Sequence, residues 1–238
     1  MQPTEIAPGL VVQGFTPPLL LSSFKLIAFD MDSTLINIEC VDEIADAAGR
    51  KAEVAAITEA AMRGEIADYK QSLRQRVALL KGVRMADLEQ VYRQRLQLNP
   101  GASQLVAACK KAGLKVLLVS GGFTYFTDRI RERLGIDFTR ANVLEEHGGV
   151  LTWRLVDQSW GDICDGQEKR RMLLQTCADL GISPLQAVAM GDGANDLPMM
   201  AAAGLSVAYH AKPKVREQAA VAINSGGLDR LLEVLTCS

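Results

Sequence analysis

Leu26-Ile27-Ala28-Phe29-Asp30-Met31-Asp32-Ser33-Thr34 is the stretch that decides the fold of this 238-residue chain, because an apolar run ends abruptly in acids. Such a run is typical of a buried strand in a sheet covered on both faces. Open α/β sheets bind ligands where these strands end. Asp30 is therefore a candidate nucleophile, Asp32 a candidate proton donor, and the pair a candidate site for a hard cation. Taken alone, an Asp-x-Asp triplet is more often a polar turn.

Three later segments repeat the pattern and predict parallel strands. Apolar runs at residues 116–119 and 187–190 end in glycines and polar residues, and a further run covers 205–208. Helical segments separate the runs, as expected for strands joined by crossover helices. Because the carboxyl ends of parallel strands share one edge of a sheet, we expect polar residues from distant segments to meet there.

The segment 41–98 is too long for a single crossover helix and predicts an inserted cap. Apolar residues recur in it at helical spacing, among them Ile44, Ala48, Ala55, Ile57, Met62, Leu73, Val77 and Leu80. We predict an α/β fold: a doubly wound parallel sheet with a Rossmann-like core at 25–40 and 99–238, a helical cap at 41–98 and a lead-in at 1–24. Gly148-Gly149, between two short apolar runs, predicts a small β-hairpin excursion.

Composition argues against several classes of function. A net charge of −2, with the charges interspersed, offers no basic surface for nucleic acid. The five cysteines form no CxxC pair, which argues against a zinc site or a disulfide framework and for a reducing compartment. Leu19-Leu20-Leu21 is too short to span a membrane or to form a signal core. We expect a cytoplasmic protein of the size of an enzyme, without a nucleic-acid or membrane partner.

Two motifs at the later strand ends, and one lysine, bear on phosphate chemistry. Ser120-Gly121-Gly122 is expected to open a helix, where free amide groups and the hydroxyl can hold a phosphate. The segment 191–196, Gly-Asp-Gly-Ala-Asn-Asp, carries acids that can complete a Mg²⁺ site with Asp30. Each motif has an ordinary alternative, since serine, asparagine and aspartate often cap helices. Lys169 begins a helical segment and, alone, is most simply a surface charge.

Together, the acidic turn 30–34, Ser120, Lys169 and the segment 191–196 resemble, in order and strand placement, the four motifs of the haloacid dehalogenase superfamily. Within it, the chain resembles the phosphoserine phosphatase family over roughly residues 25–235. The resemblance extends to residues 30–39, Val119-Ser120-Gly121-Gly122-Phe123, Leu197-Pro198-Met199 and Ala211-Lys212-Pro213. It implies Mg²⁺-dependent hydrolysis of O-phospho-L-serine to L-serine and phosphate through an aspartyl-phosphate, the last step of serine biosynthesis.

The resemblance also implies a role for each acid of the core. Asp30 would be the nucleophile and Asp32 the general acid and base. The metal ligands would be Asp30, the backbone carbonyl of Asp32, and Asp192. Asp196 would support this metal site.

Substrate binding, by the same resemblance, would involve both the core and the cap. The core residues around the phosphoryl group would be Ser120, Gly121, Lys169 and Asn195. In the cap, Glu39 would face the substrate ammonium and Arg76 its carboxylate, and the charges of both suit an amino acid.

The chain departs from the family pattern at two positions. Tyr69 stands where relatives often have Phe in the apolar part of the cap pocket, and Trp153 replaces a Gly common in the hairpin. Relatives often carry an N-terminal regulatory domain. With a short lead-in at this position, we expect no feedback through such a domain.

Two alternatives to phosphoserine hydrolysis stay open. An aspartyl-phosphate can pass to an alcohol as well as to water, so a phosphotransferase, or a phosphatase for another small phosphomonoester, would use the same motifs. A receiver-like signalling module also places acids, a hydroxyl residue and a lysine on a parallel sheet. The large insertion and the position of the acids after the first strand argue against a receiver.

Overall fold

A nine-stranded sheet forms the centre of the computed structural model, which describes residues 2–62, 65–66 and 68–236. Six neighbouring strands are parallel, in the order β6-β5-β4-β8-β9-β10. Their bounds are Leu26–Phe29 (β4), Lys115–Phe123 (β5), Phe138–His147 (β6), Ala187–Gly191 (β8), Leu205–Tyr209 (β9) and Val221–Ile223 (β10). This order is the doubly wound, Rossmann-like arrangement that the sequence predicts. It reverses between β4 and β8, at the point where such sheets bind ligands.

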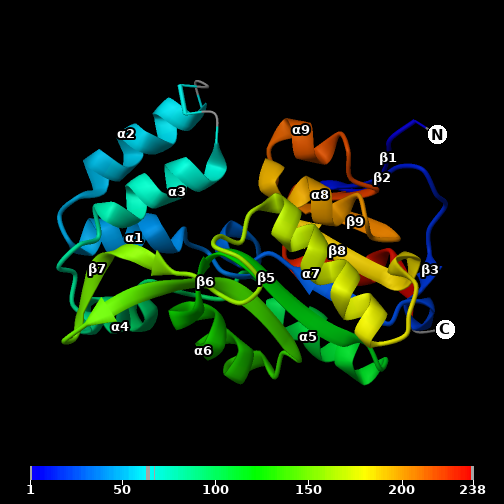
Figure 1. Cartoon of the computed structure of the whole chain (residues 1–238). Helices are drawn as coiled ribbons and strands as arrows, with labels where there is room; N and C mark the ends of the chain where they lie inside the picture. The colour runs from blue at the N-terminus through cyan, green and yellow to red at the C-terminus, as the bar shows by residue number, and fades with distance from the viewer. Residues whose placement is uncertain (1, 63–64, 67, 237–238) are drawn as a thin grey trace.

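Helices cover both faces of the central sheet (Figure 1), and alternate side chains of β4 pack on opposite faces. Ile27 and Phe29 share a core with α5 and α6, whereas Leu26 and Ala28 share one with α7, α8 and α9. The helices are Ala102–Lys111 (α5), Thr124–Leu134 (α6), Gly166–Asp179 (α7), Leu197–Met200 (α8) and Pro213–Arg216 (α9). All four β4 residues are buried, so the uninterrupted apolar run reflects a strand covered on both faces.

Four helices lie in the described part of the segment in which the sequence predicts a cap. They are Cys40–Ala47 (α1), Lys51–Met62 (α2), Tyr69–Ala78 (α3) and Met85–Gln94 (α4). The chain leaves and re-enters the core side by side, since Ile36 and Leu98 form an antiparallel bridge. Asn99 secures this crossing by donating to the carbonyls of Thr34 at 2.8 Å and Ile36 at 2.9 Å. Figure 1 shows α1, α2 and α3 together at one end of the molecule, away from α8 and α9.

Both outer edges of the sheet are formed by segments that the sequence predicts to lie outside it, the hairpin and the lead-in. The predicted hairpin is present, but its first strand β6 pairs with β5, so β7 (Val150–Val156) extends the main sheet. At the other edge, β2 (Leu10–Val12) pairs antiparallel with β10, and β1 (Thr4–Ala7) pairs with β2. The predicted lead-in thus contributes strands to the core sheet. A separate pair joins β3 (Leu19–Leu20) to β11 (Leu235–Thr236).

Membrane insertion has no support among the described helices, since each of them is too short or too polar to cross a bilayer.

Candidate active site

Acids from two adjacent strands meet at the switch point of the sheet. Asp30 directly follows β4 and Asp192 directly follows β8, and these strands pair in register through Phe29 and Met190. Both acids line a pocket of about 310 Å³. Residues from the cap, among them Glu39 and Arg76, line the same pocket. The structure therefore brings the predicted catalytic and substrate-binding residues to one cavity, except Lys169, which is fully buried and does not line it.

Lys169 is fully buried next to Asp30 and Asp196, so its interpretation, taken alone, as a surface charge is wrong. Its Nζ donates to Asp30 Oδ1 at 2.6 Å and to Asp196 Oδ1 at 2.7 Å. Burial alone would lower the pKa of Lys169, but Asp196 and Asp30 outweigh it and hold the pKa well above its ordinary value. The lysine stays protonated and supplies a fixed positive charge beside Asp30.

The acids nevertheless outnumber the cation that faces them. Burial and the charge of Asp196 raise the pKa of Asp30 well above its ordinary value, although Lys169 opposes them. Burial and Asp196 likewise raise the pKa of Asp192 to about 6. Asp30, Asp192 and Asp196 each bring an oxygen within 4.8 Å of the others. Such an oxygen-rich group fits a hard divalent cation, which would restore the charge balance.

Asp196 already uses both of its oxygens. Oδ1 accepts from Lys169, and Oδ2 accepts from the backbone N–H groups of Asp192 at 3.1 Å and Gly193 at 3.0 Å. A side chain at Gly191 would collide with this carboxylate. Asp196 thus positions the loop after β8, and neither Asp192 nor Asn195 caps the short helix that follows. Asp30 and Asp192 are the carboxylates of the group that remain for a cation.

Asp32 has surroundings unlike those of Asp30. It accepts from the backbone N–H of Cys40 through Oδ2 and from the Cys40 thiol through Oδ1, both at 3.1 Å. Burial and the charge of Glu39 raise the pKa of Asp32 to about 7, and the two bonds from Cys40 offset this only in part. A carboxyl that titrates near neutrality can both give and take a proton, as a general acid and base must. Sequence reasoning missed Cys40, because its thiol is eight residues away and only the fold brings it to Asp32.

The turn after β4 is tight and places the hydroxyl of Thr34 against Asp192. Ser33 has a φ of 57°, a left-handed conformation that is uncommon for a residue with a side chain. Next to it, Thr34 is buried, and its Oγ1 donates to Asp192 Oδ1 at 2.8 Å. Sequence reasoning assigned Thr34 no role, although a hydroxyl within the acidic turn was a usable signal.

Ser120 lies inside a strand, so the prediction that it opens a helix is wrong. β5 continues through Phe123 after an irregularity in its pairing with β6, and α6 begins only at Thr124. Ser120 is fully buried, and its Oγ accepts from the backbone N–H of Gly122 at 2.8 Å. The hydroxyl still reaches the pocket, but the positive end of a helix does not begin at this residue.

Asn142 of β6 is a further residue that sequence reasoning missed. Its Nδ2 donates to the carbonyl of Gly121 at 2.7 Å, and its Oδ1 accepts from the N–H of Cys164 at 2.8 Å. Asn142 is buried and so fixes Gly121 relative to the segment that leads to α7 and Lys169. No signal in the sequence distinguished it from other residues of the hairpin.

The cap side of the pocket carries opposite charges. Glu39 is exposed at the rim, and its Oε1 accepts from the Ser33 hydroxyl at 2.6 Å. Arg76 of α3 is half-buried, and its Nε is buried without a hydrogen-bond partner. Tyr69, at the start of α3, lies directly against Gly121, where an added Cβ would collide with its hydroxyl. Asn195, from the core, lines the same pocket.

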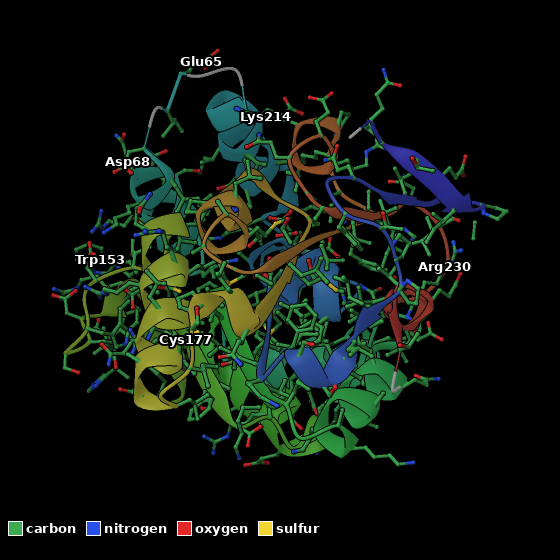
Figure 2. The ribbon with its side chains drawn as sticks, turned by 90° about the vertical axis from the view of Figure 1, so that its right-hand side faces the viewer. Glu65, Asp68, Trp153, Cys177, Lys214 and Arg230 are labelled. Atoms are coloured by element: carbon green, nitrogen blue, oxygen red, sulfur yellow. The ribbon has the colours of Figure 1, made fainter. Side chains whose placement is uncertain are left out.

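The two departures from the family pattern differ in position. Tyr69 lines the pocket, and burial raises its pKa. Trp153 is 51% exposed on β7, is not part of the pocket wall, and lies at the outer edge of the molecule in Figure 2. Only the change at Tyr69 can touch a substrate.

Comparison with known proteins agrees with this geometry. The chain matches the haloacid dehalogenase-like hydrolase family over residues 24–204. It is 80% identical to a phosphoserine phosphatase of Polaromonas sp., over 99% of this chain and all of the relative. It is 76% identical to one of Albidiferax ferrireducens, over 98% of this chain and 99% of the relative. A solved phosphoserine phosphatase with a phospho-aspartyl intermediate analogue superposes with a TM-score of 0.81 at 38% identity, covering 90% of this chain and 99% of the other.

The sheet is Rossmann-like and carries paired acids at its switch point. With the family match over residues 24–204, this shows that the chain belongs to the haloacid dehalogenase-like hydrolases. This membership argues against the receiver-like alternative. Among these hydrolases, the chain belongs to the phosphoserine phosphatase family.

Proposed function

We propose that the protein hydrolyses O-phospho-L-serine to L-serine and phosphate, the last step of serine biosynthesis. The observation that carries the proposal is a single pocket in which a buried acid next to a buried lysine faces a cap lined by opposite charges. The 80% identity to a phosphoserine phosphatase, over 99% of this chain and all of the relative, supports it. The buried free thiols of Cys40, Cys164 and Cys177 support a cytoplasmic location.

In the first half of the reaction, a carboxylate oxygen of Asp30 attacks phosphorus and the bond from phosphorus to the serine oxygen breaks. Asp32, protonated at the outset, gives its proton to the departing serine oxygen. In the second half, water attacks phosphorus of the aspartyl-phosphate and gives a proton to Asp32. The bond from phosphorus to the Asp30 oxygen breaks, which frees the carboxylate and releases phosphate. The pKa of about 7 at Asp32 suits it to both transfers.

Charge neutralisation accompanies both halves of the reaction. Lys169 is held beside Asp30, where it can neutralise a phosphoryl oxygen, and Ser120 and the backbone of Gly121 line the same end of the pocket. Asp30, the backbone carbonyl of Asp32, and Asp192 would hold Mg²⁺. When bound, the ion supplies further positive charge to the phosphoryl oxygens.

Recognition of the amino acid falls to the cap. The guanidinium of Arg76 can pair with the substrate carboxylate, and its buried Nε is available as a donor. Glu39 can attract the ammonium from the rim. Tyr69 closes the pocket over Gly121, which would keep bulk water from the phosphoenzyme.

The test is phosphate release from a panel of phosphomonoesters, each with Mg²⁺ and with a chelator. We expect O-phospho-L-serine to be preferred and the chelator to abolish release. Comparable rates on all members of the panel, or transfer to an alcohol in place of water, would favour the alternative functions.

The Asp30→Asn variant tests the nucleophile in the same assay. Its side chain has nearly the same shape, so the fold should persist while turnover disappears. A covalent phosphate should be trapped on the unaltered protein and be missing from the variant. Substantial phosphate release by the variant would contradict the proposed role of Asp30.

A further inference from the structure

We infer that Asp42 is a specificity-determining residue whose Oδ1 accepts a hydrogen bond from the ammonium group of the substrate, beside Glu39. The inference rests on the proposed function, because it concerns the amino-acid end of the phosphoserine pocket.

Asp42 occupies the same side of the pocket as Glu39. It lies in the first turn of α1, three residues after Glu39, which precedes the helix as its N-cap. Residues three apart face the same side of a helix. Both line the pocket, together with Arg76 from α3.

Two buried polar atoms in this pocket lack partners. Of the described side chains, only Asp42, Arg76 and Thr127 have a buried nitrogen or oxygen without a hydrogen bond, and the first two line the pocket. Buried polar groups are almost always paired, so each atom indicates a missing partner. Asp42 Oδ1 needs a donor and Arg76 Nε needs an acceptor. The ammonium and the carboxylate of an amino acid supply one of each.

A purely structural role for Asp42 fits these facts less well. An acid in the first turn of a helix is favoured by the helix dipole, but the buried Oδ1 accepts no backbone N–H. Asp42 and Arg76 also form no ion pair with one another. Burial raises the pKa of Asp42, and the positive charge of Arg76, which forms no ion pair with it, offsets this only in part. The carboxylate therefore lacks a close cation, as expected for a group that meets one on the substrate.

Glu39 alone would not satisfy the hydrogen-bond donors of the substrate ammonium. Glu39 has one oxygen engaged by the Ser33 hydroxyl, whereas an ammonium group has three donors. With Glu39 and Asp42 against Arg76, this end of the pocket has one more negative charge than positive. It would attract the ammonium and repel an acid that lacks one, such as 2-hydroxy-3-phosphooxypropanoate.

The experiment compares Asp42→Asn with the unaltered, Mg²⁺-loaded protein on three substrates. These are O-phospho-L-serine, O-phosphoethanolamine, which lacks the carboxylate, and 3-phosphooxypropanoate, which lacks the ammonium. We expect kcat/KM to fall about tenfold or more for the first two and to stay level or rise for the third. For Arg76→Ala, we expect kcat/KM to fall for O-phospho-L-serine and 3-phosphooxypropanoate, which carry a carboxylate, and to stay level for O-phosphoethanolamine.

Asp46→Asn is the matched control, because Asp46 lies on the same helix but pairs with Arg95 outside the pocket. It should leave the ratios among the three substrates unchanged. A loss by Asp42→Asn on the carboxylate-bearing substrates alone would mean that Asp42 orients Arg76, and would overturn the inference. An equal loss on all three, or no loss, would overturn it as well. If the unaltered protein shows no preference for phosphoserine, the proposed function itself fails, whatever the variants do.

Discussion

Two aspartates separated by one residue acquire different chemistry from their partners. Asp30 contacts a buried ammonium, whereas Asp32 contacts a thiol and a backbone N–H, which stabilise its charge less. In the proposed mechanism, the same type of side chain therefore attacks phosphorus at one position and carries a proton at the other. The sequence predicts these two roles, but the partners that distinguish the acids, Lys169 and Cys40, reach them only through the fold.

The raised pKa of Asp192, about 6, leads to a prediction for the metal-free protein. Because the folded state holds this proton more tightly than the unfolded chain, the contribution of Asp192 to the unfolding free energy is greatest at low pH. It should decrease as pH rises from about 4 through 6, by roughly 1–2 kcal/mol after solvent screening. Urea unfolding at pH 5 and pH 7.5 with a chelator measures the difference.

Mg²⁺ should remove most of this loss, because the cation stabilises the ionised acid and binds only the folded state. The Asp192→Asn variant is the control, since it carries no titrating group there and should show a smaller pH dependence. Equal stability of the metal-free protein at both pH values would contradict the assignment.

At the scale of the element, the end of β5 and the start of α3 close the pocket together. Gly121 has no side chain, and the Tyr69 hydroxyl occupies the space that a Cβ would take. A methyl group at position 121 would therefore push the Tyr69 ring, and with it the start of α3, away from the strand. The position of the cap thus depends on the contact between Gly121 and Tyr69.

Gly121→Ala should lower kcat/KM for phosphoserine by roughly tenfold, because a cap held open misplaces Arg76 and admits water. Adding Tyr69→Phe removes the colliding hydroxyl and should restore most of the activity. Steady-state kinetics of both single variants and the double variant give the measurement. Failure of the double variant to recover would assign the loss to the phosphate end of the pocket instead.

At the scale of the whole molecule, the N-terminal strands protect the edge of the parallel sheet. β2 covers β10, with Leu10 fully buried and Val12 nearly so. Removing residues 1–13 would expose these backbone groups and the apolar side chains beneath them. We expect a loss of about 3 kcal/mol or more in unfolding free energy and a tendency to associate through the open edge.

Denaturant unfolding of this truncated chain, compared with a chain that lacks only residues 1–3, measures the effect. The shorter deletion stops before β1 and should be nearly neutral. Both proteins should keep their substrate preference, since the pocket lies among the central strands. Unchanged stability after removal of residues 1–13 would mean that β2 contributes little to the sheet.

The sequence by itself determined the strand that ends in Asp30 and Asp32, the doubly wound class and the inserted helices, because buried strands and amphipathic helices have distinct periods. It also marked Asp192, through the acidic motif after a later strand, whereas Glu39 and Arg76 were indicated only by the resemblance to the phosphoserine phosphatase family. Only the tertiary structure decided that Lys169 is buried between two acids, that Ser120 continues a strand, and that Thr34, Cys40 and Asn142 support the site. Burial and hydrogen bonds join residues that are distant in the chain, and local patterns carry no record of them.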